Sequence, residues 1–308
     1  MQLAESKTRP KGHSIVDTPQ LFKQEIADQV LLSVHLLGKP TAAQLTRLHA
    51  DQVSGDRAMR EVLIRLSGAS QQLLASITPI EIQRPSIFMP KIYLDTTKSR
   101  RHLQKTKAIP FRRPPELPSR DWRFLRHDVE MVDELISFEL TARSCGAQFG
   151  FESHYDVVGE RVFPAVTISN NDLTHTLKPQ PDKTLINGDY HQIHEKDLGE
   201  ETIGLGHIMR DATLTRKHLV YDQLERTGIL DELGWGKRIY TYIIDGKKRT
   251  QTSSRKRIKS ALEHMPDLPI REKTFFVDRQ SFMEAGDDVS AVKWVRGDGK
   301  QMCLPCYR

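Results

Sequence analysis

The chain has 308 residues, of which 38% are hydrophobic and 28% charged, and its formal net charge at pH 7 is +6. This length favours two domains, and no run approaches the roughly 18 consecutive apolar residues of a membrane-spanning helix, so we expect no membrane association. The N-terminal residues lack the apolar stretch of a signal peptide, and three cysteines are too few for a secreted disulfide scaffold, so a cytoplasmic location is expected.

Helical periodicity begins after an N-terminal tail, residues 1–17. Apolar residues at helical spacing predict a first helix that starts near Thr18, and Gly38 and Pro40 end it. Thr41 is placed to cap a second helix with the sequence TAAQLTRLHA. Two helices joined by a short turn are typical of helix-turn-helix modules.

A third helix is predicted from Asp56 to Leu66, followed by strand-like runs at residues 73–82 and 86–94. This order indicates a winged helix-turn-helix DNA-binding domain over residues 18–97, in which the third helix enters the major groove. A winged helix used for protein contact is the alternative. The arginines predicted to face DNA from the third helix are Arg57, Arg60 and Arg65.

Two segments concentrate positive charge without any acidic residue. Residues 98–113 and residues 247–259 each hold seven Lys or Arg. Such runs favour a polyanion because bound cations release counterions, and a solvated linker or loop is the alternative. The first run opens a basic, Pro-rich linker, residues 98–120, where we place the domain boundary. The predicted DNA contacts in these runs are Arg100, Arg101, Arg112, Arg113, Arg255, Lys256 and Arg257.

Residues 121–308 form the second predicted domain. It opens with an amphipathic helix from about Arg126 to Ser144, continues through several short strand-like runs, and reaches a long helix from about His207 to Arg226. A strand, a basic helix and a last strand follow. This order predicts an α/β fold, of α+β type, with a mixed sheet.

Acidic residues gather around the predicted strands of this domain. Asp182 precedes the strand KTLIN, and Glu195 and Asp197 lie at the end of the strand YHQIHEKD. Because side chains alternate along a strand, Glu195 and Asp197 share a face while Lys196 points to the other. Crowded carboxylates repel each other, and a hard cation such as Mg²⁺ or Mn²⁺ relieves the repulsion. We therefore predict that these three carboxylates bind the metal with help from Glu152; edge carboxylates paired with Lys or Arg are the alternative.

The order of these residues resembles the replication-relaxation family, which includes MOB-C type relaxases of mobilisable plasmids. The resemblance covers roughly residues 20–245. It implies a winged helix followed by a PD-(D/E)xK nuclease-like core. The matching positions are His127 before an amphipathic helix, Glu152 in an early strand, Pro181 and Asp182 before a strand, Glu195, Asp197 and Gly199 in a segment like E-x-D-x-G-T-E, and Tyr221 after a basic run.

The sequence departs from these patterns at two positions. Glu200 stands where the family has Thr, and Asp197 stands where PD-(D/E)xK nucleases place a lysine that orients water or stabilises developing charge. We hypothesise that Lys183 or Lys196 takes the role of that lysine. The predicted catalytic residues are therefore Asp182, Glu195, Asp197, Glu152, Lys183 and Lys196.

Other residue types that can carry chemistry are predicted to be structural. Two residues separate His191 from His194, so the two rings lie on opposite faces of a strand. Tyr221 lies at helical spacing with apolar neighbours and is predicted to pack. Cys303 and Cys306 form a single C-x-x-C pair, which alone cannot complete a tetrahedral zinc site.

The combined expectation is a relaxase-like, metal-dependent endonuclease that nicks DNA at an origin of plasmid or mobile-element transfer or replication. Its expected partners are double-stranded origin DNA and accessory mobilisation or coupling proteins. The alternative is a non-catalytic DNA-binding replication initiator or transcriptional regulator with the same fold. The complete set of acids favours the enzyme, and the absence of lysine at position 197 favours the binding protein.

Overall fold

The computed structural model describes residues 18–80, 90–107, 122–152, 163–170, 173–199, 203 and 213–307, without the side chains of residues 18–23, 123, 124, 152, 170 and 173. The chain is a mixed α/β protein with helices on both faces of a mixed sheet. None of the helices in these ranges is long and apolar enough to cross a membrane. The predicted DNA contacts Arg112 and Arg113 lie outside the described residues.

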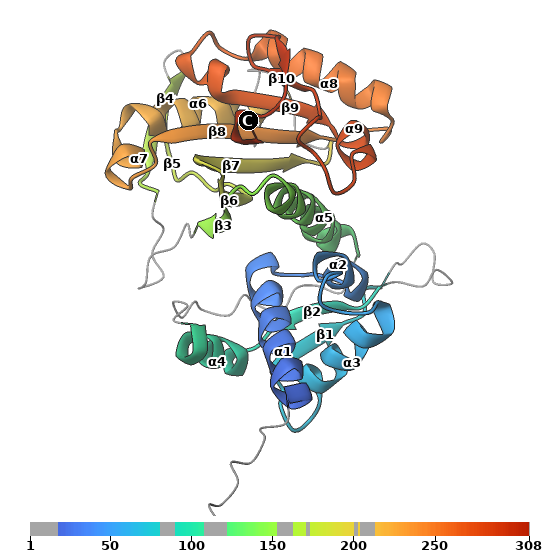
Figure 1. The fold of residues 1–308 in the computed structure, drawn as a ribbon. Coiled ribbons are helices and arrows are strands. Elements are labelled where there is room, and N and C mark those ends of the chain that lie inside the picture. The colour runs from blue at the N-terminus through green and yellow to red at the C-terminus, as the bar shows by residue number, and fades with distance from the viewer. Residues whose placement is uncertain are drawn as a thin grey trace, which may run out of the picture.

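The N-terminal part contains a group of helices and a two-stranded hairpin (Figure 1). The helices are α1 (Thr18–Leu37), α2 (Ala42–Leu48) and α3 (Asp56–Ser67), and strands β1 (Leu74–Ile77) and β2 (Ile92–Asp95) pair antiparallel. The predicted helices are confirmed, and both strands are present although shorter than predicted. Whether this order of elements is a winged helix stays a prediction.

Thr41 begins α2 as the sequence predicts. Its hydroxyl accepts a hydrogen bond from the backbone N–H of Gln44 at 3.3 Å, and Gln44 Oε1 accepts one from the backbone N–H of Thr41 at 2.8 Å. These two bonds close a capping box. Gln44 Nε2 also donates to the carbonyl of Val129 at 2.8 Å. Gln44 therefore links α2 to the next long helix, α5 (Trp122–Ser144).

Helix α4 (Thr97–Lys107) corrects the predicted linker. Leu103 is fully buried in the same core as α1. Arg100 is buried in a bidentate ion pair, with Nε 2.6 Å and Nη2 2.9 Å from the two carboxylate oxygens of Asp95. The linker prediction is wrong for this segment because the prolines that break helices begin only at Pro110. Arg100 is thus a structural residue, whereas Arg101 is exposed.

We expect Leu103→Ala to lower the free energy of unfolding by about 2–4 kcal/mol, because it leaves a cavity beneath a helix that belongs to the core. Urea denaturation followed by circular dichroism measures this. Lys105→Ala, an exposed change on the same helix, is the control and should change the free energy of unfolding by less than about 0.5 kcal/mol. Equal effects of the two changes would mean that α4 does not pack on α1.

The second part is built on a seven-stranded sheet with the order β11-β10-β9-β8-β7-β6-β3. Strand β8 pairs parallel with both β7 and β9, and the other neighbours pair antiparallel. Strands β4 (Val166–Asn170) and β5 (Leu173–Leu177) form a separate hairpin. The strands of the large sheet are β3 (Phe149–Glu152), β6 (Lys183–Asn187), β7 (Tyr190–Asp197), β8 (Lys237–Ile244), β9 (Thr274–Asp278), β10 (Trp294–Arg296) and β11 (Gln301–Met302).

Helices cover both faces of this sheet (Figure 1). On one face, α5 and α9 (Arg279–Glu284) contribute apolar side chains to a core that contains Ile243 of β8. On the other face, α6 (Leu214–Arg226) and α8 (Gln251–His264) form a second core with Tyr242 of β8. The short helical segments are α7 (Ile229–Glu232), η1 (Pro269–Lys273) and η2 (Pro305–Tyr307).

The two parts of the chain share one apolar core. The cluster that contains Val30 of α1 and Leu45 of α2 also contains Leu135 of α5 and Phe275 of β9. Polar contacts reinforce this junction, since Arg47 Nη2 donates to Ser137 Oγ at 2.7 Å. Helix α5 therefore packs against both parts of the chain.

Candidate active site

Strand β7 distributes its charged side chains over the two faces of the sheet. Glu195 contacts α6, Asp197 contacts α8, and Lys196 contacts α5 on the opposite face. The predicted alternation is confirmed. The same alternation separates His191, which stacks on Trp235, from His194, whose Nε2 lies 3.0 Å from Glu134 Oε2.

Asp182 and Glu195 lie together. Asp182 Oδ2 accepts a hydrogen bond from the backbone N–H of Lys196 at 2.9 Å, which holds the carboxylate of Asp182 over β7 beside Glu195. The side chain of Asp182 is 24% exposed, whereas that of Glu195 is 1% exposed. The negative charge of Asp182 is close enough to raise the pKa of Glu195. The structure thus brings two of the three predicted metal ligands to one point.

Helix α6 supplies the partners of Glu195. Lys217 Nζ lies 2.8 Å from Glu195 Oε2, and the Tyr221 hydroxyl donates to Glu195 Oε1. Lys217 and Tyr221 are four residues apart, so they share one face of the helix. Burial raises the pKa of Glu195 to about 8, although Lys217 and Tyr221 act in the opposite direction. At neutral pH Glu195 therefore holds a proton for most of the time.

His127 is the partner of Asp182. Its Nε2 lies 3.3 Å from Asp182 Oδ2, and its Nδ1 lies 3.2 Å from Asp128 Oδ1. Burial opposes the charge of His127, but the two carboxylates raise its pKa to about 10. Burial also opposes the charge of Asp182, yet the hydrogen bond and charge of His127 lower the pKa of Asp182 to about 2. Asp128 in turn pairs with Lys39, which follows α1. Asp182 is thus held ionised by a chain of charges that reaches the N-terminal part.

Asp197 is separated from this pair. Its Oδ2 accepts a hydrogen bond from Arg257 Nε on α8, and its Oδ1 accepts one from the backbone N–H of Gly199 at 2.8 Å. Gly199 has φ +81°, and a Cβ there would lie 2.9 Å from the carbonyl oxygen of Asp245. The glycine of the motif therefore permits β7 and β8 to end in close contact. Within the described residues, no three His, Cys, Asp or Glu side chains are grouped so that they could hold a metal ion.

The other predicted catalytic residues are placed elsewhere. Lys196 is 1% exposed and bonds Glu134 on the face of the sheet opposite to Glu195. Lys183 Nζ lies 3.4 Å from the carbonyl oxygen of Leu36, at the end of α1. The backbone of Glu152 pairs with Thr184 of β6, but the side chain of Glu152 is outside the described part. The lysine that meets Glu195 is Lys217, which the sequence prediction missed.

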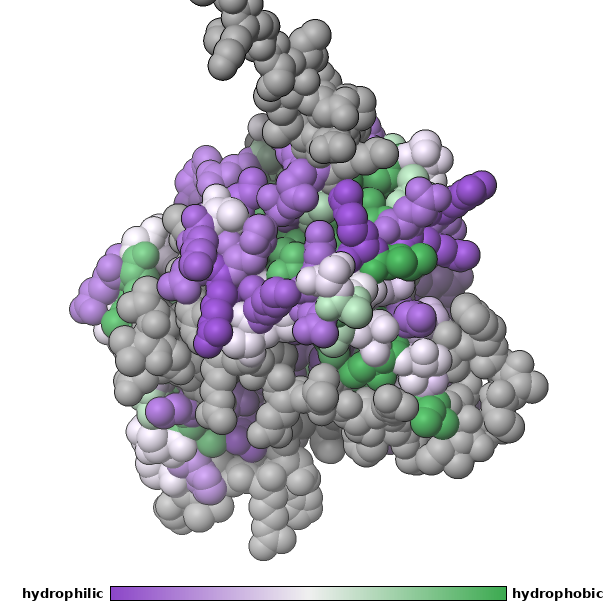
Figure 2. All heavy atoms as spheres, turned by 90° about the horizontal axis from the view of Figure 1, so that it is seen from below, coloured by the Kyte–Doolittle hydropathy of each residue, from purple (hydrophilic) through white to green (hydrophobic). Residues whose placement is uncertain are grey.

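The basic residues predicted to contact DNA differ in accessibility. The side chain of Arg57 on α3 is 95% exposed and Arg60 is also exposed, whereas Arg65 is partly buried. On α8, Arg255 and Lys256 are exposed, while the side chain of Arg257 is only 9% exposed. Figure 2 views the molecule from the side of the N-terminal part, and hydrophilic side chains dominate the described portion of that face.

The chain is thus a mixed α/β protein with two neighbouring carboxylates, Asp182 and Glu195. Glu195 is buried beside Lys217, and burial raises its pKa. No known protein family, curated protein or solved structure matches the chain.

Proposed function

We propose that this protein is a relaxase-like DNA-binding nuclease that nicks origin DNA with a divalent metal during plasmid or mobile-element transfer or replication. The observation that carries the proposal is the convergence of Asp182, just before β6, with Glu195 of β7 and Lys217 of α6. The resemblance to the replication-relaxation family adds the origin as the DNA target and mobilisation or coupling proteins as partners. Arg57 and Arg60 on α3 are exposed and, in this proposal, would contact the duplex.

Two carboxylates are compatible with Mg²⁺ or Mn²⁺. Mg²⁺ keeps several waters and is usually held by one or two carboxylates together with substrate phosphates. Asp182 is ionised and partly exposed, so it would bind the cation first, and Glu195 would join after losing its proton. Asp197 would stay in its pair with Arg257. The bound metal would polarise the scissile phosphate and lower the pKa of a water.

The residues of the chain itself have distinct parts in this proposal. Lys217 lies 2.8 Å from Glu195 Oε2 and would stabilise the negative charge that develops on the phosphate. It would therefore replace the lysine that Asp197 displaces from the nuclease pattern. His127 holds Asp182 ionised through the contact at 3.3 Å.

A second candidate is a DNA-binding protein that does not cleave. Glu195 is buried beneath Tyr221 and Lys217 and keeps a proton at neutral pH. Asp197 is neutralised by Arg257. These features suit a core that stays folded without any metal, as a replication initiator or regulator requires.

Nicking of supercoiled plasmid that carries the cognate origin tests the proposal. With Mg²⁺ or Mn²⁺, we expect relaxed product from the wild type, and at least a hundredfold slower nicking from Asp182→Ala and Lys217→Met, because each removes charge stabilisation from the reacting centre. Matched controls are Asp189→Ala and Lys237→Met, whose side chains are 81% and 58% exposed.

The two candidates give opposite results in this assay. Origin binding without relaxed product, with either metal, would favour the binding protein. Nicking that survives Lys217→Met would show that this lysine has no part in the reaction. Circular dichroism of each variant checks that the fold is retained.

A further inference from the structure

A hollow of about 480 Å³ lies beside the first turns of α8. It is formed by the turn after β8, by the start of α8 and by Ile203. The residues that line it are Ile203, Lys247, Lys248, Thr250, Thr252, Ser253, Lys256 and Arg257. Four of these eight residues are cations, and none carries a carboxylate.

The cations of this hollow differ in how firmly they are held. Lys247, Lys248 and Lys256 are exposed. Arg257 is 9% exposed on its side chain and is tied to Asp197 at the end of β7. The lining therefore combines one cation held by an ion pair with three exposed lysines. Lysine serves as a point charge for phosphate, and arginine adds directional donors.

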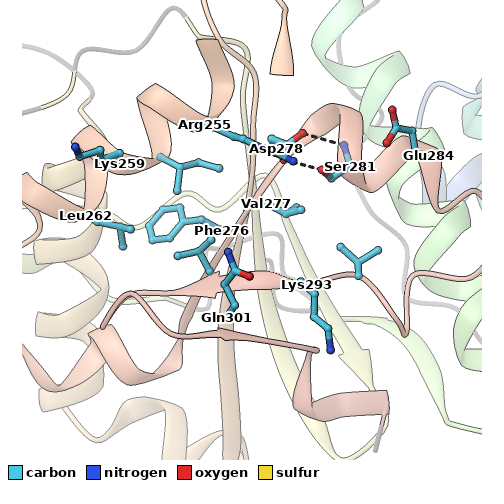
Figure 3. Close-up of a pocket in the computed structure, with 13 residues that line it drawn as sticks. Arg255, Lys259, Leu262, Phe276, Val277, Asp278, Ser281, Glu284, Lys293 and Gln301 are labelled. Carbon is cyan, nitrogen blue, oxygen red and sulfur yellow. Dashed lines mark hydrogen bonds and ion pairs between the residues drawn. The ribbon is translucent and has the colours of Figure 1, made fainter. Parts of the chain in front are cut away.

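The hollow on the other side of α8 provides a contrast (Figure 3). Its volume is about 540 Å³, and it mixes the cations Arg255, Lys259 and Lys293 with the acids Asp278 and Glu284. Arg255 forms an ion pair there with Asp278, with Nε of Arg255 3.4 Å from Oδ2 of Asp278. Among the described residues that line the two hollows, acids accompany the cations in the second hollow, whereas the first has cations and no acid.

We propose that the hollow at the start of α8 binds a phosphate group of a nucleic-acid backbone. The assignment rests on the proposed function, because Arg257 joins the hollow to Asp197, two residues along β7 from Glu195. Two residues of a strand span roughly 7 Å. A nucleic-acid strand whose phosphate occupies the hollow therefore passes close to the Asp182–Glu195 pair. The hollow therefore anchors the substrate beside the acids, in addition to the contacts proposed for α3.

Salt-dependent DNA binding tests this site. Fluorescence anisotropy of a labelled origin oligonucleotide, single-stranded and duplex, is measured from about 50 to 300 mM NaCl. For a variant with Lys247→Gln, Lys248→Gln and Lys256→Gln, we expect at least tenfold weaker binding at 100 mM NaCl. We also expect the slope of log K against log salt to become shallower by about 0.7–0.9, the contribution of one neutralised phosphate.

A matched control removes three lysines from outside the hollow: Lys259→Gln, Lys293→Gln and Lys300→Gln. It has the same net charge as the test variant, and its slope should change by less than about 0.5. Equal changes in the two variants, or none in the test variant, overturn the assignment.

Titration with inorganic phosphate separates the two sources of the ligand. Phosphate binding that the test variant loses while its DNA affinity stays at the wild-type value would overturn the nucleic-acid assignment in favour of a free phosphate. Cleavage is scored separately, in the nicking assay. A wild type that shows the lysine-dependent slope but never nicks would uphold the hollow and refute the proposed nuclease.

Discussion

Lys196→Met is expected to lower the free energy of unfolding by about 3–5 kcal/mol. Lys196 and Glu134 are 1% and 0% exposed and form an ion pair between β7 and α5. Burial opposes the charge of Glu134, but Lys196 keeps the pKa of Glu134 below its ordinary value, so the carboxylate is ionised. Removing the lysine leaves that charge buried with His194 as its remaining close partner. Urea denaturation at pH 7 measures the change.

A second substitution identifies the cause. The double variant Lys196→Met with Glu134→Gln removes both charges, and we expect it to recover at least half of the lost free energy, because a neutral pair has no buried charge to compensate. Lys237→Met, at an exposed lysine, is the control and should cost less than about 1 kcal/mol. A cost for Lys196→Met as small as that of the control would contradict the buried pair. Any loss of nicking in Lys196→Met must therefore be corrected for unfolding.

Glu195 should make the protein less stable as the pH rises. Its folded pKa, about 8, lies above the ordinary value of 4.5 because the carboxyl is buried. The folded state keeps a proton that the unfolded state loses above pH 4.5. The stabilisation from Glu195 is therefore fully present below pH 4.5 and is lost as the pH rises through 8. The separation of the two pKa values corresponds to at most about 5 kcal/mol.

The measurement is the free energy of unfolding between pH 5 and 9 in buffer with a chelator. We expect the decline to be less steep in Glu195→Gln, since the amide has no proton to lose. Glu263→Gln changes a glutamate whose side chain is 57% exposed and should leave the wild-type curve unchanged. Parallel curves for the wild type and Glu195→Gln would show that Glu195 is ionised throughout.

Local sequence signals predicted the elements that depend on local physics. The capping of α2 by Thr41 and the alternation along β7 both follow from neighbours within a few residues. The linker prediction failed at α4 because the sequence TKSRRHLQKTK has a single strongly apolar residue, Leu103, which packs in the core that contains α1. The linker was predicted from the many basic residues of this segment, and its weak helical periodicity was given less weight.

The candidate site was predictable only in part. The proximity of Asp182 and Glu195 follows from the antiparallel pairing of β6 with β7. Lys217 and Arg257 come from helices that follow later in the chain, and their partners depend on how α6 and α8 cross the sheet. The i, i+4 pair of Lys217 and Tyr221 was the one local signal that both side chains share a target. Sequence spacing could not show that Asp197 would form an ion pair with Arg257.

Helix α5 packs against both parts of the chain, and this fixes how they are arranged. One apolar core contains residues of α2, α3, α5 and β9, so α3 and the Asp182–Glu195 pair lie in parts of the chain that pack against each other. If α3 binds the duplex, the protein fixes the number of base pairs between the sequence that α3 contacts and the nick. An origin with half a helical turn inserted between the two positions would present the wrong side of the duplex to the acids.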